Sequence, residues 1–258
     1  MPRKKRTFPI TYLFPNIITV AGLCVGLSAI RFAMLGRWEM AVTFLIAAAI
    51  IDGMDGRLAR MLNATSTFGA QLDSLADFVS FGVAPVMVMY LWNMSHVKGL
   101  GWLVVLFFAV CMALRLARFN TSIFEGDKKE KMTDPEAFFT GVPAPAGALL
   151  SLLPMVLTFE FGEGLYSNPL FCIAYVAIIA LLLVSTLPTL SAKKFKIPST
   201  MAGPFIVVSC LFIAGWIIAT WITFALTACI YLLSIPYTVS KASRQRRAAE
   251  SETPQQDT

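Results

Sequence analysis

Residues 52–77 read DGMDGRLARMLNATSTFGAQLDSLAD and interrupt a chain that is otherwise strongly apolar. The stretch contains four aspartates: Asp52, Asp55, Asp73 and Asp77. The first two are three residues apart and the last two are four apart, and residues at either spacing share one face of a helix. Two helices folded side by side would bring both pairs into one acidic pocket at a membrane surface.

Four carboxylates in so small a space repel one another unless a cation neutralises them. Mg²⁺ takes oxygen ligands and commonly uses one or two carboxylates together with substrate phosphates. Two such ions, about 3.5–4 Å apart, can hold both oxygens of an in-line displacement at phosphorus. Three small residues leave room for a ligand close to the backbone: Gly56, Ala59 and Gly69.

The alternative is that the aspartates only form ion pairs with Arg57 and Arg60. Two arginines do not balance four carboxylates, so charge is left over in this interpretation. Ionisable groups near a bilayer are also candidates for function by default. We therefore favour a metal-dependent site.

The composition is that of an integral membrane protein. Of the 258 residues, 57% are hydrophobic and only 14% are charged, and the mean hydropathy is +0.71. A soluble domain would have about 25% charged residues. No second domain and no internal repeat is visible, so we expect a single membrane domain over residues 1–240.

The hydropathy pattern predicts an all-α bundle of about eight transmembrane helices. A span takes about 20 residues, so the long apolar run 201–240 is divided near 215–220. The other expected spans are 16–35, 38–61, 68–92, 101–120, 142–159 and 169–187, of which those in 16–120 form the catalytic core and those in 142–240 the remainder. Residues 1–15 are basic and aromatic and predict an interfacial segment. Residues 241–258, basic and then polar, predict a disordered tail.

The basic residues predict the topology. With eight spans and a cytoplasmic N-terminus, only Arg31, Arg37 and Lys98 of the 21 lysines and arginines lie towards the outside. That distribution follows the positive-inside rule, whereas seven spans would leave the basic C-terminal block outside. We therefore expect a multi-pass protein of the cell (inner) membrane with both termini and the aspartates on the cytoplasmic side.

The aspartate stretch resembles the signature of the CDP-alcohol phosphotransferase family, DGxxARx(8)GxxxDxxxD, with one further aspartate three residues before it. Every fixed position is present: Asp52, Asp55, Gly56, Ala59, Arg60, Gly69, Asp73 and Asp77. Members of that family displace CMP from a CDP-linked donor with a small alcohol. The resemblance also implies a homodimer, and no nucleic acid is expected as a partner.

The resemblance implies a role for each of these residues. The four aspartates would ligate two divalent ions, Mg²⁺ or Mn²⁺, that hold the donor diphosphate, and Asp77 would also be the general base for the acceptor hydroxyl. Gly56 and Ala59 would make space for the nucleotide, and Arg60 and Gly69 would complete the donor site.

Three further stretches resemble the branch of the family that makes phosphatidylserine: FPNIITVAGLCVGL at 14–27, ALRLARFN at 113–120 and FFTGVPAPAG at 138–147. This resemblance implies CDP-diacylglycerol and L-serine as substrates and phosphatidylserine and CMP as products. Arg115 and Arg118 are three apart, and an arginine fork could bind the serine carboxylate. They could instead snorkel to headgroups or pair with a motif aspartate. Asn120 could cap the helix end or bind the acceptor.

Other functions remain open from the residues alone. Glycerol 3-phosphate or inositol phosphate as acceptor should need a denser cationic pocket, and choline should need an aromatic cage. A cation transporter could also use buried aspartates. Transporters commonly place such sites near the bilayer midplane, often within internal repeats, whereas these aspartates lie towards helix ends.

Overall fold

A computed structural model describes residues 13–61, 66–125, 139–140, 142–185, 188–189 and 202–252. Most of the expected interfacial segment, residues 1–15, therefore lies outside the described residues, as do the last residues of the expected tail. Within that segment, Phe14 and Pro15 already belong to the first helix. Proline is favoured in the first turn of a helix because its missing N–H has no partner there anyway.

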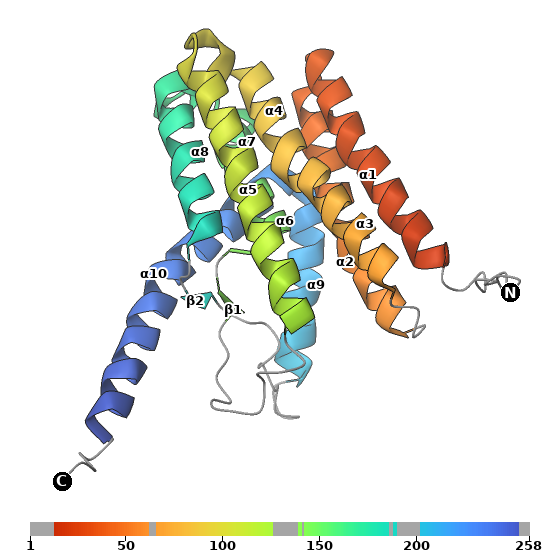
Figure 1. Cartoon of the computed structure of the whole chain (residues 1–258). Coiled ribbons are helices and arrows are strands. Elements are labelled where there is room, and N and C mark those ends of the chain that lie inside the picture. The colour runs from red at the N-terminus through yellow and green to blue at the C-terminus, as the bar shows by residue number, and fades with distance from the viewer. Residues whose placement is uncertain are drawn as a thin grey trace, which may run out of the picture.

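The first half of the chain forms long helices that run back and forth along the bundle (Figure 1). A tight turn with Gly36 at φ 71° joins the first two of them. The elements are α1 (Leu13–Met34), α2 (Trp38–Met61), α3 (Thr67–Asp77), a π-helical segment η2 (Phe78–Val83), α4 (Ala84–Trp92), a short 3-10 turn η3 (Met94–His96) and α5 (Leu100–Glu125).

The second half adds α6 (Ala144–Ser151), α7 (Leu153–Phe161), a 3-10 turn η4 (Leu165–Ser167), α8 (Pro169–Val184), α9 (Ala202–Ile218) and α10 (Thr220–Glu252). Two strands of two residues, β1 (Phe139–Thr140) and β2 (Pro188–Thr189), pair antiparallel. This ladder ties the segment before α6 to the segment after α8. It is the one departure from the predicted all-helical fold among the described residues.

Small side chains let α1 and α2 pack closely. The buried faces of the pair carry Ala29 and Ala33 from α1 and Ala41, Val42 and Ala48 from α2. Short side chains allow helix backbones to approach, which favours helix association in membranes. This packing holds the C-terminal half of α2, where Asp52 and Asp55 lie, against the start of α1.

Two prolines shape the helices. Pro154 lacks the N–H that would bond to the carbonyl of Leu150, and α6 and α7 meet there at a bend of 42°. The hydroxyl of Tyr175 on α8 donates to that free carbonyl at 3.0 Å. Pro85 likewise removes the donor for the carbonyl of Phe81, and the turn just before it is π-helical.

Four described helices or helical runs are long and apolar enough to cross a membrane, or five if the bent pair α6–α7 counts as one span. Helix α8 and the segment Ile206–Ile218 are apolar but shorter. Helix α2 is long enough but contains Glu39, Asp52 and Asp55. The chain is thus a helical membrane protein, and the number of eight spans stays a prediction.

The helix ends differ from the expected ones in two places. Helix α5 continues to Glu125, so Asn120 does not lie at the helix end and the expectation that it could cap that end is wrong. Helix α10 continues to Glu252, where a disordered tail was expected from residue 241. The break at residue 219, between α9 and α10, falls inside the predicted range 215–220.

Candidate active site

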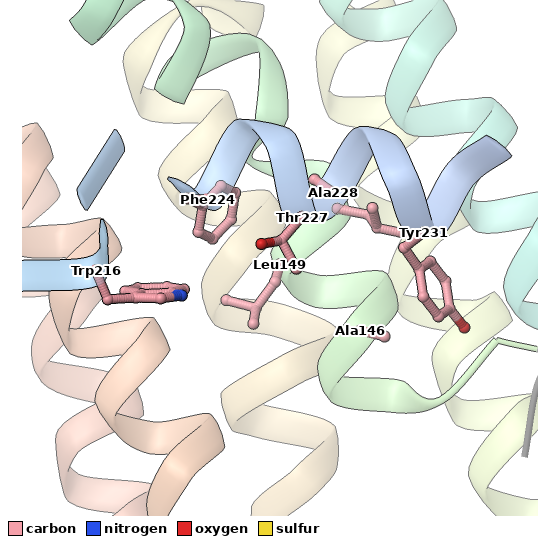
Figure 2. A pocket seen from close by; sticks show the side chains of 8 residues that line it. Ala146, Leu149, Trp216, Phe224, Thr227, Ala228 and Tyr231 are labelled. Carbon is pink, nitrogen blue, oxygen red and sulfur yellow. The ribbon is translucent and has the colours of Figure 1, made fainter. Parts of the chain in front are cut away.

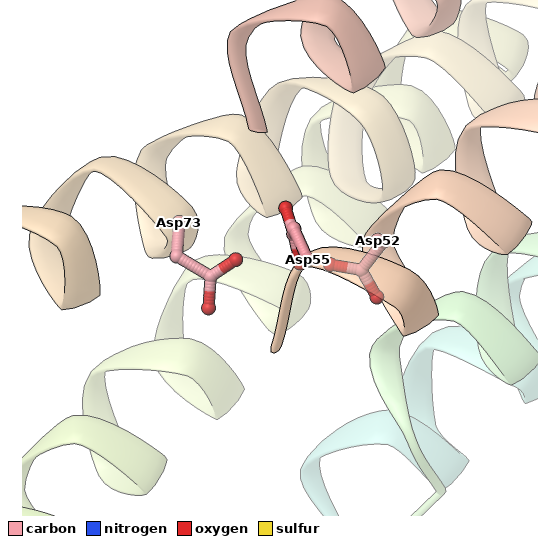
Figure 3. A group of neighbouring side chains, drawn as sticks. All are labelled: Asp52, Asp55 and Asp73. Carbon is pink, nitrogen blue, oxygen red and sulfur yellow. The ribbon is translucent and has the colours of Figure 1, made fainter. Parts of the chain in front are cut away.

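Three of the four aspartates, two from α2 and one from α3, come together. Carboxylate oxygens of Asp52, Asp55 and Asp73 all lie within 4.8 Å of one another (Figure 3). Asp55 is buried, with 4% of its surface exposed, and the other two are partly buried. The prediction that the two helices bring their carboxylates together is therefore confirmed for these residues.

Asp77 lies one helical turn beyond Asp73 and is not part of that group of three. It lines one small cavity together with Asp52 and Asp55, which places it next to the same cluster. The group of three could hold a cation, and Asp77 lies beside it.

Thr19 on α1 also belongs to the site. Its hydroxyl lies 2.8 Å from Oδ2 of Asp55 and 3.1 Å from the carbonyl oxygen of Pro15, and both are acceptors. Thr19 and Asp55 are buried, so the hydroxyl fixes one carboxylate oxygen away from bulk water. Sequence reasoning missed Thr19, although a polar residue within an apolar span is a usable signal.

The start of α3 packs closely against α1. The side chain of Ser66 accepts a hydrogen bond from the Gly69 N–H at 3.0 Å and caps the helix. A Cβ at position 69 would lie 2.9 Å from Oδ1 of Asn16 on α1. Gly69 therefore has a packing reason to be glycine, and its expected role in donor binding stays a prediction.

Gly56, the other glycine of the signature, borders open space. A Cβ at Gly56 would meet no heavy atom of the described residues within 4 Å, which is what a ligand-binding position near the backbone requires. Arg57 is exposed on the same helix. Ala59 and Arg60 follow in the last turns of α2, and their side chains lie outside the described part of the chain.

Arg115 on α5 lies between Asp77 and the segment that precedes α6. Its Nε donates to the carbonyl oxygen of Val142 at 2.6 Å, and its charge interacts with Asp77 and Tyr231. The sequence left open whether this arginine contacts a substrate or a motif aspartate. Arg115 forms no ion pair with an aspartate of the described residues, so both possibilities stay predictions. Arg118, by contrast, is exposed.

Asn120 joins α5 to α3. Its amide nitrogen donates to the hydroxyl of Ser74 at 3.0 Å, and that hydroxyl lies 3.1 Å from the amide oxygen. Ser74 directly follows Asp73, so the pair fixes the turn of α3 that carries this carboxylate. Sequence reasoning did not find Ser74, because nothing in its local pattern marks it.

Two cavities in the described part of the molecule bear on function. A small one of about 10 Å³ lies directly behind the carboxylates, and its lining includes Thr19, Asp52, Asp55, Asp77 and Ser80. A larger one of about 160 Å³ lies between α6, α9 and α10 (Figure 2). Its lining is apolar and aromatic and would accommodate an alkyl group rather than a charged one.

The comparisons with known proteins agree with this site. The sequence profile of the family described as CDP-alcohol phosphatidyltransferase matches residues 12–239. A protein of Mycobacterium leprae named CDP-diacylglycerol–serine O-phosphatidyltransferase is 37% identical over 92% of this chain and 78% of its own length.

Relatives in other bacteria have the same name. The one in Mycobacterium tuberculosis (strain ATCC 25618 / H37Rv) is 37% identical over 92% of this chain and 82% of its own length. The one in Helicobacter pylori (strain ATCC 700392 / 26695) is 37% identical over 72% of this chain and 75% of its own length. Together with the profile match and the four clustered aspartates, these similarities show that the chain belongs to the CDP-alcohol phosphatidyltransferase family.

Proposed function

We propose that this chain transfers the phosphatidyl group of CDP-diacylglycerol to the hydroxyl of L-serine, which gives phosphatidylserine and CMP. The observation that carries the proposal is the convergence of Asp52, Asp55 and Asp73 within 4.8 Å, with Asp77 beside them on the same small cavity. The family supplies the reaction class, and the shared name of the relatives supplies the acceptor.

The carboxylates suit hard divalent cations, because every ligand atom they offer is an oxygen. Asp52, Asp55, Asp73 and Asp77 would hold two ions, Mg²⁺ or Mn²⁺. When bound, such ions neutralise the donor diphosphate and stabilise CMP as it leaves. The bond from Thr19 holds Asp55 in one orientation, as expected for the outer partner of a metal ligand.

Asp77 is the proposed general base. Its carboxylate accepts the proton of the acceptor hydroxyl while the hydroxyl oxygen forms a bond to the phosphorus of the phosphatidyl group. The bond between that phosphorus and the CMP oxygen breaks, so CMP leaves with the electron pair. Asp77 suits this role because it lies at the edge of the cluster, where the charge of Arg115 also acts on it.

Arg115 is the favoured partner for the serine carboxylate. Its Nε is engaged with Val142, and no other hydrogen bond of this guanidinium group is made to the described residues. The two terminal nitrogens can therefore form a fork for a carboxylate. The hydroxyl group of a serine bound through its carboxylate to Arg115 would point towards Asp77. Arg118 and Asn120 are the further candidates for acceptor binding.

The placement of the site also supports a cytoplasmic orientation. The start of α1, the ends of α2 and α5 and the start of α3 all lie at one end of the bundle (Figure 1). Arg57 near the end of α2 and Arg118 on α5 are basic residues towards this end, in line with the positive-inside rule. We propose eight spans, cytoplasmic termini in the cell (inner) membrane, and a homodimer.

An acceptor panel tests the function. Purified protein in detergent receives CDP-diacylglycerol, Mn²⁺ or Mg²⁺, and in turn serine, glycerol 3-phosphate, inositol phosphate or choline, and CMP release is followed. We expect release with serine alone. Asp77→Asn should abolish it, whereas Glu39→Gln, an exposed carboxylate at the other end of α2, should leave it unchanged.

Release with a different acceptor would keep the family chemistry and reject serine. A protein that releases no CMP with any acceptor would not be a transferase of this kind, and uptake of divalent ions into vesicles would then be the expected activity of a cation transporter.

A further inference from the structure

Ser80 has a buried hydroxyl group that lacks a partner. Only 3% of its surface is exposed, and its Oγ makes no hydrogen bond to any described residue. Buried polar groups in native proteins almost always have a partner in the protein or in ordered water, so each exception needs an explanation. Ser80 lies three residues after Asp77.

Other serines in helices of this chain satisfy their hydroxyl groups locally. Ser74 bonds to the carbonyl oxygen of Ala70 at 3.1 Å, and the fully buried Ser151 bonds to that of Ala148 at 2.6 Å. This back-bonding is the usual behaviour of a serine within a helix. Ser80 departs from it because it lies in the π-helical segment η2. Such turns occur frequently at functional sites.

Ser80 is one of the residues that line the small cavity next to the carboxylates. Asp52, Asp55, Asp77 and Thr19 line the same cavity of about 10 Å³. That volume is at the lower limit for one water molecule, which also needs two to four polar partners. Three carboxylates and two hydroxyl groups meet this need.

A glycine on α1 allows this arrangement. A Cβ at Gly26 would lie 2.6 Å from Oγ and 2.8 Å from Cβ of Ser80, so any side chain at this position would displace the serine. The π-helical turn and the glycine come from separate parts of the chain, and both serve to place one hydroxyl group beside the aspartates.

We propose that Ser80 is a positioning residue for Asp77. Its hydroxyl holds one buried water in the small cavity, and this water donates to the carboxylate of Asp77 and so fixes the direction in which that carboxylate faces the acceptor. The inference rests on the proposed function, in which Asp77 takes the proton of the acceptor. Outer partners of this kind typically change activity or metal affinity by about 10–100-fold when they are removed.

The test compares Ser80→Ala with Ser151→Ala, which removes an equally buried hydroxyl group far along the chain from the aspartates. For Ser80→Ala we expect kcat to fall about tenfold or more, with the KM for CDP-diacylglycerol within about twofold of the wild type. Ser151→Ala should keep kcat within about twofold. Each kcat is measured with the acceptor that the wild type uses and is divided by the wild-type kcat. The ratio therefore tests the role of Ser80 even if the acceptor is not serine.

A second measurement needs no activity. If the Ser80 hydroxyl has no partner in the protein, its removal relieves an unpaired buried group and should raise the melting temperature in EDTA. If it holds a water, the melting temperature should stay equal or fall. A raised melting temperature, or a kcat within about twofold of the wild type, overturns the proposal.

Ser80→Cys covers the case in which the alanine variant does not fold. The thiol has nearly the size of the hydroxyl but is a weak donor, so kcat should again fall. Wild-type kcat in Ser80→Cys would contradict a role for hydrogen bonding at this position.

Discussion

The hydroxyl of Thr19 and Oδ2 of Asp55 lie 2.8 Å apart, which joins α1 to the carboxylate cluster on α2 and α3. Both residues are buried, at 8% and 4% exposure. Three helices therefore build the site, although the signature motif covers only α2 and α3. The orientation of Asp55 depends on a residue that lies 36 positions before it.

Thr19→Val keeps the shape of the side chain and removes the hydroxyl. It leaves Asp55 without this donor, so we expect a loss of about 10–100-fold in apparent Mn²⁺ affinity or activity. The Mn²⁺ dependence of CMP release measures it. Thr43→Val is the control, because the exposed Thr43 on α2 bonds only to the carbonyl of Glu39 in its own helix. An unchanged Mn²⁺ dependence in Thr19→Val would show that the bond is not needed.

Asp73→Asn should increase the stability of the metal-free protein and weaken its response to Mn²⁺. The carboxylates of Asp52, Asp55 and Asp73 lie within 4.8 Å and repel one another when no cation is bound. Removing one charge should raise the free energy of unfolding in EDTA by on the order of 1 kcal/mol. The same variant should need at least about tenfold more Mn²⁺ for half-maximal activity. Thermal unfolding in EDTA and Mn²⁺ titration check the two effects. A lower melting temperature in EDTA would contradict the repulsion argument.

Much of the fold follows from the sequence because few arrangements satisfy it. Apolar runs of about 20 residues must be helices in a membrane, since every backbone group needs a partner there. The three- and four-residue spacings of the aspartates then bring both pairs together wherever α2 and α3 are neighbours. The helix positions and the cluster of Asp52, Asp55 and Asp73 could be predicted for these reasons.

Other features depend on tertiary contacts that local patterns do not record. Thr19, Ser74 and Ser80 are ordinary residues for an apolar helix, where their hydroxyl groups can bond to the backbone. Only the packing of α1 against α2 and η2, and of α5 against α3, gives them partners or leaves them without one. Hydropathy also marks where an apolar run ends and not where the helix ends, so α5 and α10 continue into polar sequence.

Gly26→Ala should be strongly destabilising. The added Cβ would lie 2.6 Å from Oγ and 2.8 Å from Cβ of Ser80, and overpacking of this kind typically costs about 1–3 kcal/mol. Ser80→Gly in the same chain removes both atoms and should recover part of the loss. Melting temperatures of the two single variants and the double variant measure the coupling between the positions.

Gly53→Ala serves as the control for this cycle, because a Cβ there meets nothing within 4 Å and alanine favours the helix. If the Gly26→Ala and Ser80→Gly effects simply add, the two residues are not in the contact described above.

Arg115→Lys tests how the acceptor is bound. Lysine keeps the charge but loses the planar fork and the Nε bond to the Val142 carbonyl. Hydrogen bonds to charged groups contribute about 1.5–3 kcal/mol, so the KM for serine should rise about 10–100-fold. The KM for CDP-diacylglycerol should stay close to the wild-type value, because we propose that the donor diphosphate binds at the aspartates. Arg118→Ala is the comparison, since Arg118 is exposed and its loss should affect serine less. If the KM for serine rises only in Arg118→Ala, the serine carboxylate binds to Arg118, one turn further along α5, and not to Arg115.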